Sequence, residues 1–192
     1  MKRLLLGWLV ALSAVDAPGC GTTALVTTWK QPGLRAFGFH KVLAFAPARD
    51  PVLRRTMEDE LVRQVGRAQA IPSYEVLQDR DVADSKAVDA LVHELGFDGI
   101  VAMRILGVTA DGVWVPAPFA SSSITLFGGP LWDFDVNDET TVRIETNVYT
   151  VPDFKLVWAA VSSTYDPASA RHLARDVASA VGRRMRAEGL FL

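Results

Sequence analysis

Apolar residues in the first half of the chain form short runs that predict strands. The run at residues 42–46 is continuous, as expected for a strand covered on both faces, and residues 99–108, with Ile100, Val101, Ile105 and Leu106, predict another strand. Residues 70–77 predict a further strand, in which Pro72 favours an edge or strand-start position.

Helical periodicity separates these runs. Apolar residues recur every four positions between residues 51 and 68, while charged residues, including Arg54 and Glu58, fill the other faces. Asp50-Pro51 is a typical helix start, with Asp as N-cap and Pro at the first helical position. Asp84 can cap a second helix, which Gly96 ends. The β-α-β-α-β order predicts parallel strands joined by right-handed crossovers.

The second half of the chain predicts an antiparallel hairpin and a last helix. Apolar and polar residues alternate over 142–149, and a turn at 152–155 leads into a return strand over 156–165. Asp166-Pro167 repeats the helix-start pattern, and Gly189 ends the helix that follows. The predicted fold class is α/β: a mixed sheet in the order β-α-β-α-β-β-β-α, as a two-layer or three-layer sandwich.

Residues 109–138 do not fit this framework. Loops longer than about 15 residues are usually functional or disordered, and a disordered loop is polar, whereas this segment is apolar. Alternating residues around Gly128-Gly129-Pro130 predict a short amphipathic hairpin. We expect either a contact surface or an extension of the core over a sheet edge. The candidate interface residues are Trp114, Phe119, Phe127, Trp132 and Phe134.

The first residues predict an export signal. Lys2 and Arg3 precede an apolar run over residues 4–15, which is too short to span a bilayer. Small residues then lead to Cys20, in a pattern that resembles the lipobox of bacterial lipoproteins. We expect Cys20 to be lipidated and to anchor the chain in a membrane. Gly21 is not an Asp, which favours the outer membrane, with the domain facing the periplasm.

These features divide the chain into three parts. We expect a signal peptide over 1–19, a lipidated Cys with a tether over 20–39, and one α/β domain over 40–192 that carries the 109–138 segment. Trp29 can dock part of the tether on the domain. The chain has 192 residues, 49% hydrophobic and 22% charged, with net charge −2, which argues against disorder and against a nucleic-acid partner. A single Cys excludes an internal disulfide.

No catalytic or metal-binding constellation is evident, and no cofactor is predicted. His40, His93 and His172 lie far apart, and none belongs to a zinc-type pair. The acidic group at Asp133, Asp135, Asp138 and Glu139 lacks the EF-hand glycine and spacing, so a solvated turn is expected there. We therefore expect no enzyme; an acidic cluster joined by a histidine from elsewhere would be needed to revive that reading.

Several stretches carry a resemblance to known families: residues 41–45, 54–59, 72–74, 98–101, 142–149, 155–158 and 164–167. They are similar to a group of uncharacterised proteobacterial lipoproteins. The order of elements resembles the periplasmic α/β domain shared by the curli-secretion lipoprotein family and the N-terminal domain of the Tol translocation protein. The resemblance implies an anchored α/β domain. It does not imply the channel of the curli relatives, because residues 109–138 lack the long alternating strands that a channel needs.

Together these features predict a non-enzymatic envelope lipoprotein that binds another envelope protein or its own copies. The alternative is a module that binds a small ligand or the cell wall, with its site formed by the 109–138 segment.

Overall fold

The computed structural model describes residues 22–34, 38–48, 50–65, 69–110, 112–116 and 140–191. The strands are β1 (Thr22–Lys30), β2 (Lys41–Phe45), β3 (Gln69–Pro72), β4 (Gly99–Ala110), β5 (Val113–Pro116), β6 (Thr141–Thr150) and β7 (Leu156–Tyr165). The helices are α1 (Pro51–Gln64), α2 (Ser85–Glu94) and α3 (Ala170–Ala187), with short 3-10 turns η1 (Ser73–Glu75) and η2 (Asp79–Asp81).

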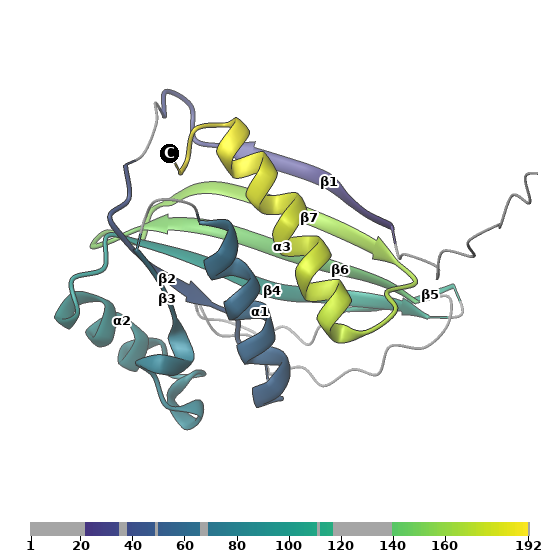
Figure 1. The fold of residues 1–192 in the computed structure, drawn as a ribbon, viewed down its shortest axis with the longest axis horizontal. Coiled ribbons are helices and arrows are strands. Elements are labelled where there is room, and N and C mark those ends of the chain that lie inside the picture. Colours follow the sequence, from purple (N-terminus) through teal and green to yellow (C-terminus); the bar gives the residue numbers. More distant parts are fainter. Residues whose placement is uncertain are drawn as a thin grey trace, which may run out of the picture.

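Over these ranges the strands form one mixed sheet of seven, which confirms the predicted α/β class. Six strands follow the order β1-β7-β6-β4-β2-β3, and β5 pairs with the far end of β4 (Figure 1). As predicted, β2 runs parallel to both β3 and β4. The predicted hairpin is β6 and β7, and it is antiparallel.

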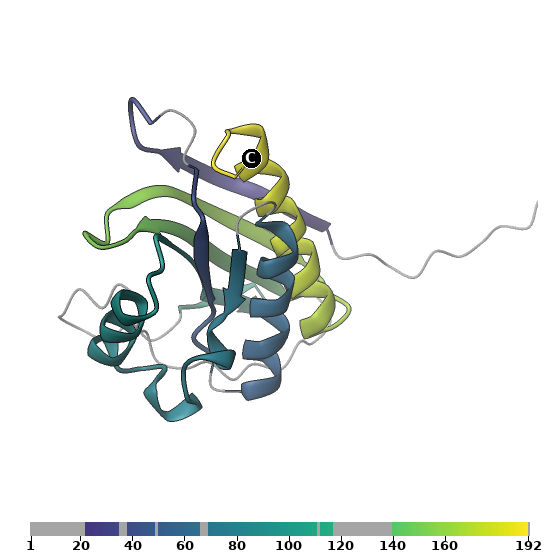
Figure 2. The ribbon, with the colours of Figure 1, turned by 60° about the vertical axis from the view of Figure 1, so that its left-hand side comes forward.

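The helices lie on both faces of the sheet, but unequally. α1 and α3 cover one face, and α2 lies against the other face beside β2 and β3 (Figure 2). The chain steps from β2 to β3 and then back across β2 to β4. Two right-handed crossovers in opposite directions therefore place α1 and α2 on opposite faces. Alternate β2 residues supply the two cores, Val42 and Ala44 toward α1, Leu43 and Phe45 toward α2.

Two of the three predicted helix starts are confirmed. The Asp50 carboxylate accepts from the Val52 amide, and Asp84 accepts from Lys86 and Ala87. The third start is wrong. Asp166 adopts φ +46 and its amide donates to Thr140, so α3 begins later, with Ser169 as its N-cap.

Two predicted segment boundaries are also wrong. The tether predicted over 20–39 is, over Thr22–Lys30, a strand paired along its length with β7, because Leu25 packs against the helix-side core and its β-branched neighbours suit a strand. The 109–138 segment is not wholly outside the sheet, since β4 runs to Ala110 and β5 pairs with it. The export signal, Cys20 and residues 117–139 lie outside the described residues.

In the described part of the chain, no helix has both the length and the apolar character needed to cross a bilayer.

Candidate functional site: the open face of the sheet

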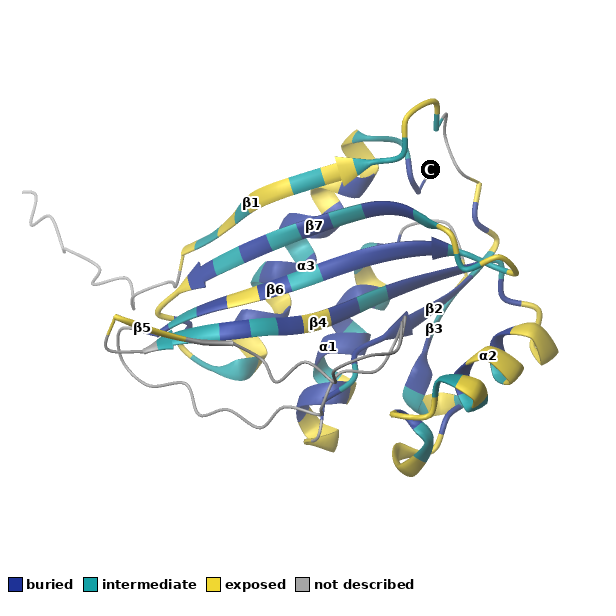
Figure 3. Ribbon diagram, turned by 180° about the vertical axis from the view of Figure 1, so that it is seen from behind, coloured by how far each residue is buried: buried dark blue, intermediate teal, exposed yellow. Residues whose placement is uncertain are grey.

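The sheet face opposite α1 and α3 carries the most exposed aromatic side chains of the described chain. We call the part of this face formed by β1, β7, β6, β4 and β5 the open face, since among the described elements α2 covers only the β2–β3 end (Figure 3). Strand alternation places Trp29 and Tyr165 on this face, whereas Trp158 and Thr164 point to the helices.

One row of paired residues crosses the open face at the end where β1 begins. Thr22 pairs with Tyr165, and Tyr165 pairs in turn with Thr141. Thr141 pairs with Thr109, which pairs with Trp114 of β5. Directly paired residues share a face, so the side chains of this row project from the same side of the sheet.

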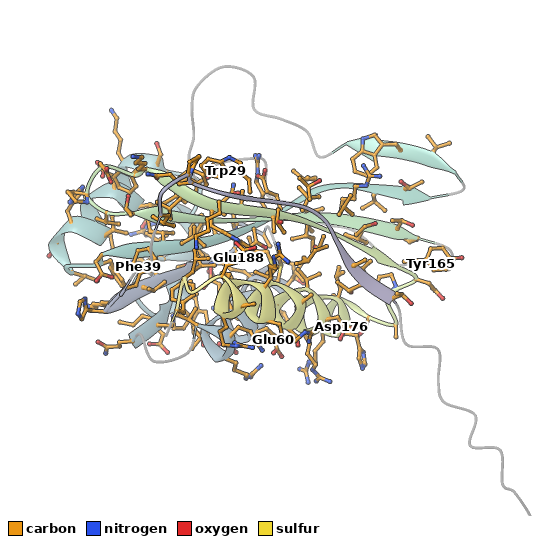
Figure 4. The ribbon with its side chains drawn as sticks, turned by 90° about the horizontal axis from the view of Figure 1, so that it is seen from above. Trp29, Phe39, Glu60, Tyr165, Asp176 and Glu188 are labelled. Atoms are coloured by element: carbon orange, nitrogen blue, oxygen red, sulfur yellow. The ribbon has the colours of Figure 1, made fainter. Side chains whose placement is uncertain are left out.

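Exposed aromatic residues mark both ends of the open face. The exposed fractions are 53% for Tyr165, 40% for Trp114 and 43% for Trp29. Tyr165 and Trp29 lie far apart along the sheet in Figure 4, on the side away from Glu60 and Asp176 of the helices. The Arg143 guanidinium lies 5.2 Å from the centre of the Trp114 ring, a cation–π contact that holds this indole over β6.

Polar side chains form a ladder along the middle of the open face. Arg104 Nε donates to Glu145 Oε2 at 2.6 Å, and the Asn147 amide donates to the same oxygen and to the Tyr149 hydroxyl, both at 3.1 Å. Asn147 is 8% exposed, and its side-chain oxygen has no hydrogen-bond partner among the described residues. Burial raises the pKa of Tyr149, which keeps its hydroxyl protonated.

The tightest polar cluster lies elsewhere, between α1 and η1. The carboxylate of Glu58 accepts from Arg54 Nε at 3.1 Å, from Ser73 Oγ at 2.6 Å, and from the backbone amides of Ala46 and Tyr74. Arg54 also donates to Ser73 and Asp79, which ties η1 and η2 to α1.

This cluster is structural. Ser73 and Glu58 are both 0% exposed, so no substrate reaches them in this arrangement. Burial raises the pKa of Glu58 despite the lowering effect of Ser73, Arg54 and the two amides. A buried carboxylate with four donors and a buried guanidinium fix the position of two elements at the carboxyl ends of β2 and β3.

A groove of about 460 Å³ runs between α1 and α3 on the outer helix surface. It is lined by Thr56, Asp59, Glu60, Arg63, Arg171 and Arg175. Arg63 pairs with Glu60, and Asp59 accepts from the Tyr74 hydroxyl at 2.7 Å. The groove therefore has mixed charge and no single sign that would select a ligand.

Only some of the residues predicted as interface or ligand residues lie in the described part of the chain. Trp114 lies exposed on the open face, while Cys20, Phe119, Phe127, Trp132 and Phe134 lie outside the described residues, as does the acidic group at 133–139. Each histidine has a polar neighbour: His40 with Asp98 and His93 with Asp89, both at 3.2 Å, and His172 with Ser169 at 2.8 Å. Within the described ranges, no three His, Cys, Asp or Glu residues gather into a possible metal site.

Sequence reasoning missed two residues of the open face. The sequence predicts a tether around Trp29 and only a strand end at Tyr165. The usable signal was in β1, where Thr, Leu, Val and Trp follow the β-branched and aromatic composition of a strand.

No protein-family model matches this chain, and no curated protein matches it. The PelC dodecamer of Paraburkholderia phytofirmans is similar in structure at a TM-score of 0.49 and 11% identity, covering 90% of this chain and 99% of that one. A leucine-to-methionine variant of the same PelC dodecamer gives a TM-score of 0.46 and 13% identity, over 84% and 96% of the two chains. Likeness at this level does not bear on what this chain binds.

Proposed function

We propose that the chain is a non-enzymatic lipoprotein of the bacterial cell envelope. Its lipid is carried by Cys20, and its α/β domain binds another envelope protein, or a second copy of itself, through the open face. The membrane is the outer membrane and the domain faces the periplasm. The similarity to the curli-secretion and Tol domains remains a prediction.

The observation that carries the binding function is the set of exposed aromatic side chains on one sheet face. Trp29, Trp114 and Tyr165 project from the face that α1 and α3 do not cover. Aromatic residues are enriched where protein partners bind, because each buries a large area with few rotatable bonds. β1 is an edge strand with one side unpaired among the described strands, and an extended partner segment can pair there.

The sequence supports the anchor. A basic start, a short apolar run and small residues precede Cys20, the only cysteine of the chain. Acyl chains on that sulfur would hold the chain on a membrane without a spanning helix.

The buried polar cluster supports a non-enzymatic role. Ser73, which donates to the Glu58 carboxylate at 2.6 Å, is enclosed together with Glu58 and Arg54, and its hydrogen bonds hold η1 and η2 in place. These groups are used for the fold.

Site-specific photo-cross-linking in cells tests the binding function. A benzophenone amino acid replaces Trp29 on the open face or, as the matched control, Val52, which is 67% exposed on α1. We expect one defined adduct from position 29, identified by mass spectrometry as a single envelope protein or as the dimer, and none from position 52. Adducts that are absent from both positions, or equal at both, contradict a specific open-face partner.

A second candidate function rests on Asn147. Its buried oxygen lacks a partner among the described residues and lies beside the Arg104–Glu145 pair, so a small polar ligand on the open face would find both a donor and acceptors there. Asn147→Leu separates the two functions. A ligand module loses binding of its small molecule, whereas a protein-binding face keeps its adduct at position 29.

A further inference from the structure

The lipid anchor and the start of the sheet are separated by one residue. Thr22 is the first residue of β1 and is held in place by pairing with Tyr165, and only Gly21 lies between it and Cys20. Consecutive Cα atoms are about 3.8 Å apart, so the Cα atom of an acylated Cys20 would lie within about 8 Å of that of Thr22. This inference rests on the proposed anchor, because that short link would bring one particular end of the domain to the bilayer.

The same end of the sheet carries exposed apolar and aromatic side chains. Tyr165 pairs with Thr22 itself, and Trp114 lies at the other end of the same row, on β5. Val113, beside Trp114, is 62% exposed. Neighbouring strands lie about 4.8 Å apart, so a row across five strands separates Thr22 from Trp114 by about 19 Å. The apolar groups therefore extend well beyond the point of attachment.

The chemistry of these side chains fits the boundary of a bilayer. Tyr and Trp have an apolar ring with a polar tip, and both are enriched at the headgroup level of membranes. Arg143 lies over the Trp114 ring on the same face and is exposed, so its guanidinium is available to headgroup phosphates. Asp166 also lies at this end and carries the opposite charge, so the aromatic rings and Val113, more than net charge, favour the bilayer.

We infer that the end of the sheet formed by Thr22, Tyr165, Val113 and Trp114 is a membrane-contact surface that seats on the lipid headgroups around the anchor. The strands then rise away from the bilayer, and α2 lies at the far end, where β4 begins (Figure 1). Trp29 and the exposed side chain of Arg104 remain clear of the membrane and accessible to a periplasmic partner. Trp29 is then the aromatic residue of the open face that serves the proposed partner, whereas Trp114 and Tyr165 face the headgroups.

Spin-label depth measurements on the full acylated chain test this surface. The chain is purified from membranes and reconstituted in vesicles of phosphatidylethanolamine and phosphatidylglycerol. A nitroxide is attached at Val113→Cys, with Leu95→Cys as the control. Leu95 is the C-cap residue of α2 and is 38% exposed, against 62% for Val113, so lower exposure to water does not by itself shield the Val113 label from nickel. Power saturation by oxygen, which partitions into lipid, is compared with saturation by a water-soluble nickel chelate.

We expect the ratio of oxygen to nickel accessibility to be several-fold higher at Val113 than at Leu95. The paired substitutions Trp114→Ser and Tyr165→Ser in the Val113→Cys chain should lower it to the Leu95 value. A Val113 label as accessible to nickel as the Leu95 label, on an acylated chain, overturns the membrane-contact surface and leaves the anchor intact. The inference is also overturned if another copy of the chain covers this end. In that case the Val113 label is shielded from nickel, but its spectrum is broadened by a second label, and dilution with unlabelled protein removes the broadening.

Failure of the proposed anchor has its own signature. In the chain without an added cysteine, acylated Cys20 has no free sulfur and takes up no label. Labelling of that chain overturns the anchor, and with it the inference.

Discussion

Arg54 and Glu58 lie one turn apart on α1 and form an ion pair that is buried on both sides, with 3.1 Å between Nε and Oε1. The side chains are 1% and 0% exposed. Glu58→Gln removes the buried carboxylate from Arg54, which keeps the half-exposed carboxylate of Asp79, and places an amide donor among other donors. Breaking a buried pair in this way typically costs about 3–5 kcal/mol, and we expect a loss of that size in the free energy of unfolding in urea.

Glu94→Gln is the matched control, since Glu94 is an exposed residue of α2, and it should change the free energy of unfolding by less than about 0.5 kcal/mol. Equal unfolding midpoints for both variants would show that the buried pair does not hold η1 and η2 on α1.

The contact between α1 and α3 depends on Gly182. A Cβ atom at this position would lie 2.6 Å from the Cβ of Gln64, closer than two such atoms approach. Gly182→Ala therefore forces the two helices apart, and overpacking of this kind costs about 1–3 kcal/mol. Gly38→Ala, with nothing within 4 Å of the added atom, serves as the control in thermal unfolding. A Gly182→Ala protein as stable as the Gly38→Ala protein would mean that α1 and α3 leave room for a methyl group at Gly182.

Tyr74 is expected to titrate far above the normal range. Its hydroxyl donates to Asp59 at 2.7 Å, and this hydrogen bond raises the pKa of Tyr74 from 10.0 to about 12. The folded state favours the protonated phenol. The stabilisation from the Tyr74–Asp59 hydrogen bond is therefore complete below pH 10 and is lost as the pH rises through about 12.

Spectrophotometric titration measures this shift, with Tyr74→Phe identifying the signal. Asp59→Asn replaces a charged acceptor by a neutral one and should move the Tyr74 midpoint toward 10. A midpoint that stays near 12 would assign the shift to burial instead.

The framework of the domain could be predicted because its signals are local. Asp50 and Asp84 cap helices where the sequence places them, and the core strand β2 lies on its apolar run. The errors arose where tertiary contacts outweigh local pattern. Arg54 and Glu58 are charged and predicted to face water, yet mutual pairing makes their burial possible.

On the open face, too, local signals could be predicted from the sequence and long-range contacts could not. The apolar segment predicts Trp114 as a contact residue, and Trp114 is exposed on β5; its role in a contact remains a prediction. Tyr165 could not be distinguished from other strand residues, since its importance comes from its pairing with Thr22, a residue 143 positions away in the chain. Sequence periodicity defines the face of a strand but not which distant strand lies beside it.

The intact mass of the chain purified from bacterial membranes tests the proposed anchor most directly. We predict a mature chain that begins at Cys20 and carries the added mass of its acyl groups, recovered in the membrane fraction. Cys20→Ser should retain residues 1–19 and lack that added mass. A mature wild-type chain with an unmodified Cys20 sulfur, or one that begins elsewhere, would contradict the lipoprotein function.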